Sequence, residues 1–440
     1  MKAQSIKLKS ITSKITKGTT PTTMGFDFID YGINFIKAEA LNGDSELDAE
    51  GFAYINDDAH NKLKRSILQK NDVLVTIAGV NIGKTGIVKQ KHLPANTNQA
   101  VGIVRIKPDL ASSVYIYYWF KNPLTFKHLQ NINAQAAQPN INLEMLGDLS
   151  LFLPNIQTQQ KIASTIFIYD ELINNNRRRI QLLEESARLL FREWFVYFRF
   201  PRLRQGFGGQ AGHEKACPVE SINSTGVKIV DGVPEGWEKG PIKKYYDTTS
   251  GGTPSREHPE YYQGDINWVK TQELDEKYIF DTEERVTQEA ISKSSAKIFP
   301  ANTLLVSIYG NANIGRTGIL AKPAASNQAC VAFFPKKPYF HFIYLQQYLQ
   351  MIRDYLVGMS QGAAQTNISQ DTLRKVNILM PDELFMNKFL KIAEPLYEQI
   401  KNLQYQNQKL AHARDLLLPR LMSGAIDPVR YDKLSNGVEA

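Results

Sequence analysis

Residues 74–87 read LVTIAGVNIGKTGI, and residues 305–319 read LVSIYGNANIGRTGI, which is the same string with one residue inserted. Further strings recur in the same order, as when INFIK at 33–37 returns as INWVK at 266–270. The separation between matching strings stays between 227 and 233 residues. An ordered series of matches at a nearly constant separation indicates an internal duplication. The sequence therefore predicts that one kind of domain occurs twice in the chain.

Each copy contains the same succession of predicted elements. Short apolar runs separated by Gly, Asn and Pro predict buried strands. A strand that ends at proline follows, LSLFLP at 149–154 and VNILMP at 376–381. A long, charge-rich stretch with helical periodicity completes each copy. The aromatic run VYIYYWF at 114–120 also has helical spacing, which favours packing in a core over stacking on bases.

The predicted fold class is α+β, with two duplicated mixed α/β domains separated by two long antiparallel coiled-coil helices. The predicted segments, in chain order, are a first domain at 1–155, a long helix at 156–200, a linker at 201–227, a second domain at 228–381, a second long helix at 382–424 and a tail at 425–440. Pro395 is expected in the first turn of the second helix or at a kink in it.

Both long helices carry a seam of mostly apolar residues in steps of four and three, which is the a/d pattern of a coiled coil. The seam residues are Ile162, Ile166, Ile173, Asn176, Ile180 and Leu183 in the first helix, and Leu396, Leu403, Asn407, Leu410, Leu417 and Leu421 in the second. An antiparallel pairing that sets Ile162 against Leu421 places Asn176 against Asn407. A pairing shifted by one heptad is the rival register. Each helix packing only on its own domain is the alternative, although the narrow seam favours a coiled coil.

Composition restricts the functional classes. The 440 residues carry a formal charge of +8, which permits a polyanionic partner without requiring one. The two cysteines, Cys217 and Cys330, lie too far apart in sequence for a disulfide framework, and no histidines have metal-ligand spacing. No apolar run approaches the roughly 18 residues of a membrane span. We therefore expect a cytoplasmic protein without a metal or membrane partner.

Motifs for catalysis are incomplete in this chain. The string around Lys84 is close to a phosphate-binding loop of the G-x-x-x-x-G-K-[ST] type, but Ala78 stands where its first glycine belongs. In the second copy Gly310 is correct, but Arg316 replaces the lysine. Each loop is therefore predicted to link two strands, and we predict that the chain is not an enzyme. A DNA-acting nucleotide hydrolase or nuclease built from two related halves remains the alternative.

Three further stretches resemble the specificity subunit of type I restriction–modification systems. They are GWEKGPIKKYYDTTSGGTPS at 236–255, SARLLFREWF at 186–195 and ARDLLLPRLMSGAI at 413–426. The resemblance implies two target-recognition domains that each bind half of a split, asymmetric sequence in double-stranded DNA. It also implies a helical spacer that docks methyltransferase subunits, expected as two copies, to which restriction (nuclease-translocase) subunits are added. S-adenosylmethionine, ATP and Mg are then expected on those partners, and no cofactor in this chain.

The candidate DNA-binding residues fall into two groups. Amide residues repeated in both copies, which alternatively serve only as turn or capping residues, are Asn98, Gln99, Gln138, Asn140, Asn327, Gln328, Gln365 and Asn367. Basic residues, which alternatively belong to an ordinary solvated surface, are Lys62, Lys64, Arg65, Lys84, Lys293, Lys297 and Arg316. A coiled-coil scaffold that binds protein instead of DNA is the third functional hypothesis.

Overall fold

The computed structural model describes residues 4–43, 46–79, 81–134, 140–200, 228–230, 232–310, 312–360 and 367–428. The predicted linker at 201–227 and most of the predicted tail lie outside the described residues, as do Gln138 and Gln365. The remaining candidate residues are described.

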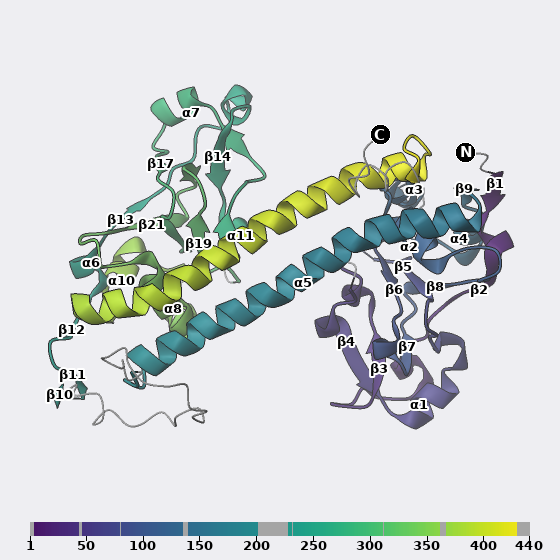
Figure 1. The fold of residues 1–440 in the computed structure, drawn as a ribbon, viewed down its shortest axis with the longest axis horizontal. Coiled ribbons are helices and arrows are strands. Elements are labelled where there is room, and N and C mark those ends of the chain that lie inside the picture. The colour runs from purple at the N-terminus through teal and green to yellow at the C-terminus, as the bar shows by residue number, and fades with distance from the viewer. Residues whose placement is uncertain are drawn as a thin grey trace, which may run out of the picture. The chain divides into compact units, whose positions relative to one another are not determined.

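The first copy contains three small sheets (Figure 1). The two-stranded sheet pairs β1 (Gln4–Lys7) with β9 (Ser150–Leu153), and the four-stranded sheet has the order β2 (Thr12–Lys17), β8 (Val101–Ile106), β5 (Val73–Thr76), β6 (Thr85–Ile87). The three-stranded sheet has the order β4 (Phe52–Ile55), β3 (Ile33–Ile36), β7 (Ala95–Thr97). Its helices are α1 (Asp57–Lys62), α2 (Ser113–Lys121), α3 (Pro123–Ala134) and α4 (Leu143–Gly147).

The second copy repeats this arrangement and adds to it. Its first two-stranded sheet pairs β12 (Glu238–Pro241) with β22 (Asn377–Met380). Its five-stranded sheet has the order β13 (Tyr246–Ser250), β21 (Cys330–Pro335), β18 (Leu304–Ser307), β19 (Thr317–Leu320), β15 (Tyr278–Ile279). The next sheet is β16 (Arg285–Val286), β14 (Ile266–Val269), β20 (Ala324–Ser326), β17 (Ile298–Phe299), and β10 (Ile229–Val230) pairs with β11 (Val233–Pro234). Its helices are α6 (Ile242–Tyr245), α7 (Gln288–Ser292), α8 (Phe342–Met351), α9 (Arg353–Ser360) and α10 (Gln370–Lys375). The corresponding strand orders agree with the predicted duplication.

Two helices of 40 residues each, α5 (Ile156–Phe195) and α11 (Glu383–Met422), end the two copies. The side chain of Asn155 accepts a hydrogen bond from the Thr158 N–H at 2.9 Å, and Asp382 accepts one from the Phe385 N–H at 2.8 Å. These equivalent caps explain why both helices begin where they do. Pro395 therefore lies well inside α11 and not in its first turn, where we had placed it as one option.

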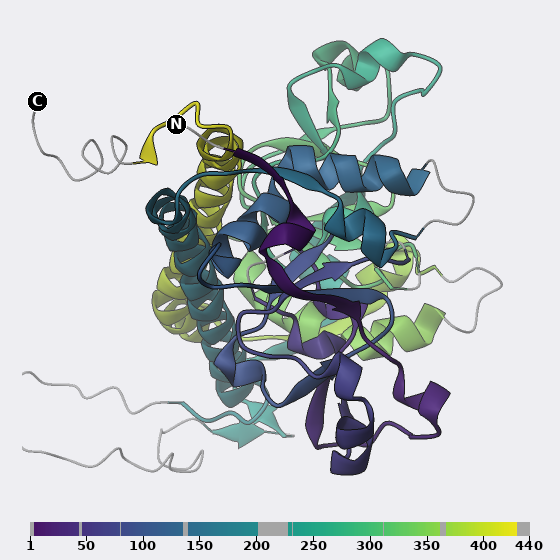
Figure 2. The same cartoon turned by 90° about the vertical axis from the view of Figure 1, so that its right-hand side faces the viewer.

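The chain divides into two compact units, and each takes half of both long helices. The first unit is Met1–Asn176 with Gln406–Ala440, and the second is Arg177–Tyr405. Figures 1 and 2 show the last turns of α11 beside β1 and the first turns of α5, all within the first unit. A unit is therefore not the same as a sequence repeat.

Both helices contribute to the core of each unit. In the first unit, Ile162 and Ile166 of α5 share a buried cluster with Leu418 and Leu421 of α11, and with the aromatic face of α2. In the second unit, Ala187 and Phe191 of α5 share a cluster with residues of α11 and α8. The aromatic run at 114–120 is thus core, as predicted: Tyr115 through Phe120 are all buried. Burial of apolar area is the main favourable contribution to folding, so each domain depends on both helices.

A buried ion pair distinguishes the first unit from the second. Arg414 Nη1 lies 2.6 Å from Asp170 Oδ1, and the side chain of Asp170 is only 1% exposed. Tyr118 Oη donates to Asp170 Oδ2 at 2.9 Å, and Lys121 Nζ lies 3.6 Å from the same oxygen. Burial, followed by the nearby Asp170 charge, raises the pKa of Tyr118 well above its usual range, so the phenol stays a proton donor.

The corresponding position in the second unit is neutral. Because α11 begins 227 residues after α5, Asp170 corresponds to Tyr397 and Arg414 to Ala187. Gln347 Nε2 donates to Tyr397 Oη at 2.8 Å there. One junction between helices and domain is therefore ionic and the other is not.

Replacing Arg414 with Ala should destabilise the first unit by about 1.5–3 kcal/mol, because the buried Asp170 carboxylate loses a charge-assisted hydrogen bond and keeps only Lys121 as a nearby cation. Hydrogen exchange should then show lower protection in α2, and unchanged protection in α8 of the second unit. The matched control is the double variant Asp170→Tyr, Arg414→Ala, which copies the neutral pair and should recover more than half of the loss. Unchanged protection in α2 of Arg414→Ala would contradict the assigned role.

Candidate nucleic-acid interface

Three backbone segments lie side by side at one edge of each domain. In the first domain, the Ile77 N–H donates to the Ala100 carbonyl at 2.8 Å, and the Ile141 N–H donates to the Ile77 carbonyl at 2.9 Å. These bonds join the turn at 98–100, the segment at 140–141 and the start of the loop between β5 and β6, which contains Lys84 and which we call the glycine loop. The second domain repeats them: the Ile308 N–H donates to Ala329 at 3.0 Å, and the Ile368 N–H donates to Ile308 at 3.1 Å.

A fourth segment crosses the same edge and explains a shared glycine. The Thr19 N–H donates to the Thr97 carbonyl at 3.1 Å, and the Gly252 N–H donates to the Ser326 carbonyl at 2.9 Å. A Cβ atom at Gly18 would lie 2.0 Å from the Thr97 oxygen, and one at Gly251 would lie 2.1 Å from the Ser326 oxygen. Only glycine permits this approach.

We call these four segments the repeat edge. Its members are residues 18–19, 77–79, 98–100 and 140–141 in the first domain, and residues 251–253, 308–310, 327–329 and 367–368 in the second.

The repeated amide residues occupy different environments on the repeat edge. Gln99 and Gln328 are exposed, and Gln328 accepts a hydrogen bond from the Thr253 hydroxyl. Asn327 Oδ1 accepts from the Ala329 N–H at 3.2 Å, which is the turn role considered as an alternative. Asn98 Oδ1 is buried and has no hydrogen-bond partner among the residues that the structure describes. Asn140 and Asn367 form equivalent bridges to Ala78 and Tyr309, so their backbones also have a structural role.

Two of the basic candidates lie next to the repeat edge. Arg65 Nη2 is 3.4 Å from both the Gly18 carbonyl and the Thr19 hydroxyl. Lys297 Nζ donates to the Thr249 hydroxyl at 2.8 Å, at the end of β13. Each domain thus places one positive charge beside the segment that contains its shared glycine.

The other basic candidates are distributed around the domains. Lys62 and Lys64 are exposed at the end of α1 and just after it. Lys293 is exposed and pairs with Glu289 at 2.7 Å, and that hydrogen bond raises the pKa of Lys293. Lys84 and Arg316 are half-buried in the loops between β5 and β6 and between β18 and β19.

The glycine loop does not have the geometry of a phosphate cradle. It joins the antiparallel strands β5 and β6, whereas a phosphate-binding loop leads from a strand into a helix. The Gly83 N–H donates to the Thr76 carbonyl at 2.8 Å, and the Lys84 N–H donates to the Asn81 carbonyl at 3.0 Å. These amides are satisfied within the loop itself. The prediction that the loop links two strands is confirmed.

Sequence reasoning missed two polar residues beside the repeat edge of the second domain. Gln370 at the start of α10 donates to the Thr248 hydroxyl at 2.8 Å and accepts from the Ser250 hydroxyl at 3.0 Å. Arg256 follows the shared Gly-x-Thr-Pro pattern, which is Gly251–Pro254 in this copy, and pairs with Glu284 at 2.7 Å. The available signal for Arg256 was its position directly after a repeated motif, where the first copy has no basic residue.

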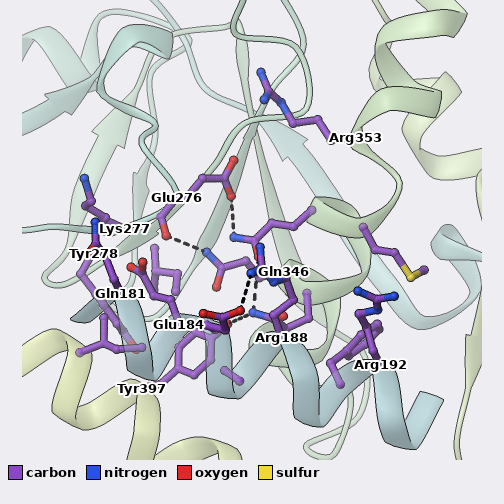
Figure 3. Close-up of a pocket in the computed structure, with 18 of the residues that line it drawn as sticks. Gln181, Glu184, Arg188, Arg192, Glu276, Lys277, Tyr278, Gln346, Arg353 and Tyr397 are labelled. Carbon is purple, nitrogen blue, oxygen red and sulfur yellow. Dashed lines mark hydrogen bonds and ion pairs between the residues drawn. The ribbon is translucent and has the colours of Figure 1, made fainter. Parts of the chain in front are cut away.

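A cavity of about 820 Å³ lies in the second unit among α5, α8, α11 and residues 276–278 (Figure 3). Figure 3 shows the Gln346 side chain directed toward the backbone of Glu276. Gln350 Nε2 donates to Glu276 Oε2 at 2.6 Å, and Gln346 Nε2 donates to the Glu276 carbonyl at 3.3 Å. Burial raises the pKa of Glu184 on the same wall. These groups bond mainly to one another and indicate no particular ligand.

Two further properties bear on the site. Within the described ranges, no cluster of three or more His, Cys, Asp and Glu side chains is arranged to hold a metal ion. Among the helices of that same part of the chain, none combines the length and apolar character needed to cross a bilayer.

Comparison with known proteins gives consistent matches. Residues 2–185 and 234–411 match the family described as "Type I restriction modification DNA specificity domain". The type I restriction enzyme HindI specificity subunit of Haemophilus influenzae is 28% identical over 329 residues, covering 66% of this chain and 71% of that protein. The MjaIX specificity subunit of Methanocaldococcus jannaschii is 24% identical over 426 residues, covering 96% of this chain and 92% of that protein. The crystal structure of the S subunit from M. genitalium shares the fold, with a TM-score of 0.59 at 13% identity over 96% of each chain.

Replacing Gly251 with Ala should destabilise the second domain by about 1–3 kcal/mol, because the new Cβ forces β13 away from the Ser326 carbonyl. The matched control is Gly358→Ala in α9, where a Cβ meets nothing within 4 Å. That change should stabilise the protein by about 0.5–1 kcal/mol through better helix propensity. Denaturant midpoints measure both effects, and equal shifts in the two variants would refute the close-packing argument.

Proposed function

The chain belongs to the type I restriction–modification DNA specificity family, and from this premise we propose that it selects the DNA sequence for such a complex. Each domain binds one half of a divided, asymmetric target in double-stranded DNA. The observation that carries this proposal is the repeat edge, where one backbone arrangement occurs in both domains with partly different side chains around it. Two domains with the same backbone arrangement and different side chains are suited to a DNA target whose two halves differ in sequence.

The chemistry of the repeat edge supports DNA as the ligand. Arg65 and Lys297 are suited to phosphate contacts, which give salt-dependent affinity and position the protein on the duplex. The exposed amides of Gln99 and Gln328 are suited to base edges, because an amide both donates and accepts hydrogen bonds. We assign phosphate contacts to the cations and base contacts to the amides.

The two long helices are proposed to form a coiled-coil spacer that fixes the distance between the half-sites. A helix of 40 residues extends about 60 Å at roughly 1.5 Å per residue. The first unit contains the beginning of α5 and the end of α11, which suits antiparallel helices. Asp170 faces Arg414, one residue away from the register that pairs Ile162 with Leu421. The pairing of Asn176 with Asn407 stays a prediction.

Chemistry and motor activity are assigned to partner subunits. We propose that this chain is non-catalytic and that two methyltransferase subunits dock on the spacer, with restriction subunits joining that core in the cytoplasm. S-adenosylmethionine, ATP and Mg would then be bound by these partners. The hairpin geometry of the glycine loop supports the assignment of ATP to a partner, because the Gly83 and Lys84 N–H groups already donate to the Thr76 and Asn81 carbonyls.

The remaining hypotheses differ in what they predict. A nucleotide hydrolase would show DNA-dependent ATP turnover in the purified chain that is lost in Lys84→Ala. A protein-binding scaffold would show no DNA affinity that decreases with salt.

Co-expression of this chain with the methyltransferase of its own system should methylate a split DNA motif, and only when this chain is present. Single-molecule sequencing of the host DNA reads both half-sites and the gap between them. Gln99→Ala should relax specificity in one half-site only, and the matched variant Gln328→Ala should relax it in the other. Methylation that is the same without this chain, or failure of the two proteins to copurify, would overturn the proposed function.

A further inference from the structure

Arg256 extends the repeat edge of the second domain with a charge that the first domain lacks. It stands two residues after the Thr253-Pro254 pair, which corresponds to Thr20-Pro21 in the first copy. The first copy has Thr23 at the position of Arg256. A difference at this point is suited to reading a base that occurs in only one half-site.

Aromatic rings hold the Arg256 guanidinium in place. Its central carbon lies 3.9 Å from the ring centroid of Tyr262 and 5.4 Å from that of Trp268. Both rings are hydrogen-bonded to this segment: Trp268 Nε1 donates to the Gly252 carbonyl in the repeat edge at 3.0 Å, and Tyr262 Oη donates at 2.7 Å to the carbonyl of Pro254, the residue that follows it. The stack therefore fixes the orientation of Arg256 relative to the proposed DNA-binding edge.

The Glu284 carboxylate forms an ion pair with the Arg256 guanidinium. Arg256 Nη2 lies 2.7 Å from Glu284 Oε2, yet the side chain of Arg256 is still 56% exposed. Lys270 donates to the other Glu284 oxygen at 3.3 Å. Although burial favours the neutral acid, the hydrogen bonds from Arg256 and Lys270 lower the pKa of Glu284 and keep it ionised. Arg256 is thus held rigidly while much of its surface faces solvent.

This arrangement is better suited to base recognition than to a phosphate contact. Lysine and arginine can both contact a phosphate, but a lysine does so as a flexible point charge that needs no stacking platform. A guanidinium presents parallel N–H donors that match the O6 and N7 acceptors of guanine in the major groove. Holding the side chain in advance reduces the entropy lost on binding. We propose that Arg256 reads a guanine in the half-site bound by the second domain, an inference that rests on the proposed function.

The test uses the full chain in complex with its methyltransferase subunits and duplexes that carry the mapped target. Each guanine of the second half-site is replaced in turn by adenine or by 7-deazaguanine, which lacks the N7 acceptor. The wild-type complex should lose about 5- to 150-fold in affinity at one of these positions. Arg256→Ala should bind cognate and substituted duplexes equally at that position and keep its discrimination everywhere in the first half-site.

Two further variants sharpen the test. Arg256→Lys keeps the charge without the paired donors, so it should keep the salt dependence of binding and lose most of the discrimination. Lys244→Ala, which removes an exposed lysine paired with Glu238 and lies outside the candidate interface, is the matched control and should retain full discrimination at the guanine. Retained discrimination at the other bases of the second half-site shows that the second domain of each variant is folded.

Three outcomes distinguish a failure of guanine recognition by Arg256 from a failure of the proposed function. If Arg256→Ala weakens all duplexes equally and reduces the salt slope by about one, Arg256 contacts a phosphate and the inference is wrong. If it leaves discrimination at every guanine unchanged, the inference is also wrong. If the wild-type complex binds the mapped target no better than an unrelated duplex of the same length, the proposed function itself fails, independently of Arg256.

Discussion

Closure of each domain core by two helices, one from each repeat, is the constraint on which the rest of the structure depends. In the first unit, Leu418 and Leu421 of α11 complete a cluster that α5 supplies with Ile162 and Ile166. The second unit is completed by the remaining halves of the same helices. A domain built this way cannot exchange its helix without losing core, since apolar burial is what stabilises it. The repeat edge is therefore carried by a framework that both copies share.

The two copies use that framework for different local chemistry. Gly18 and Gly251 hold the crossing segment against a carbonyl in both domains, so the backbone of the repeat edge is the same. The side chains around it diverge, with Arg65 beside the glycine in one domain and Lys297 near it in the other. The junctions also diverge, because a buried Asp170–Arg414 pair in one unit corresponds to Tyr397 and Ala187 in the other. The same backbone with different side chains around it allows two duplicated domains to recognise different DNA sequences.

The sequence predicted two duplicated mixed α/β domains, the strands that end before Pro154 and Pro381, and the connection of two strands by the glycine loop, because these follow from the internal repeat, periodicity and local turn chemistry. The coiled coil of the two long helices stays a prediction. It did not predict the tertiary neighbours of single side chains. Arg256 could be identified as a candidate only from its contacts with Tyr262 and Trp268, and those contacts exist only in the folded domain. Pro395 was expected either in a first turn or at a kink, and the Asp382 cap at the start of α11 excludes the first turn.

The division of the long helices between the units also sets an order of events during synthesis. The second unit, Arg177–Tyr405, is one continuous stretch and is complete once its last residue has emerged. The first unit must wait for Leu418 and Leu421, although its strands are made earlier. At roughly 5–20 residues per second, the ribosome needs about 12–50 seconds to travel from the middle of α5 to the end of α11. The part of the chain that is made first is thus the last to be finished, and its apolar helix face stays open in the meantime.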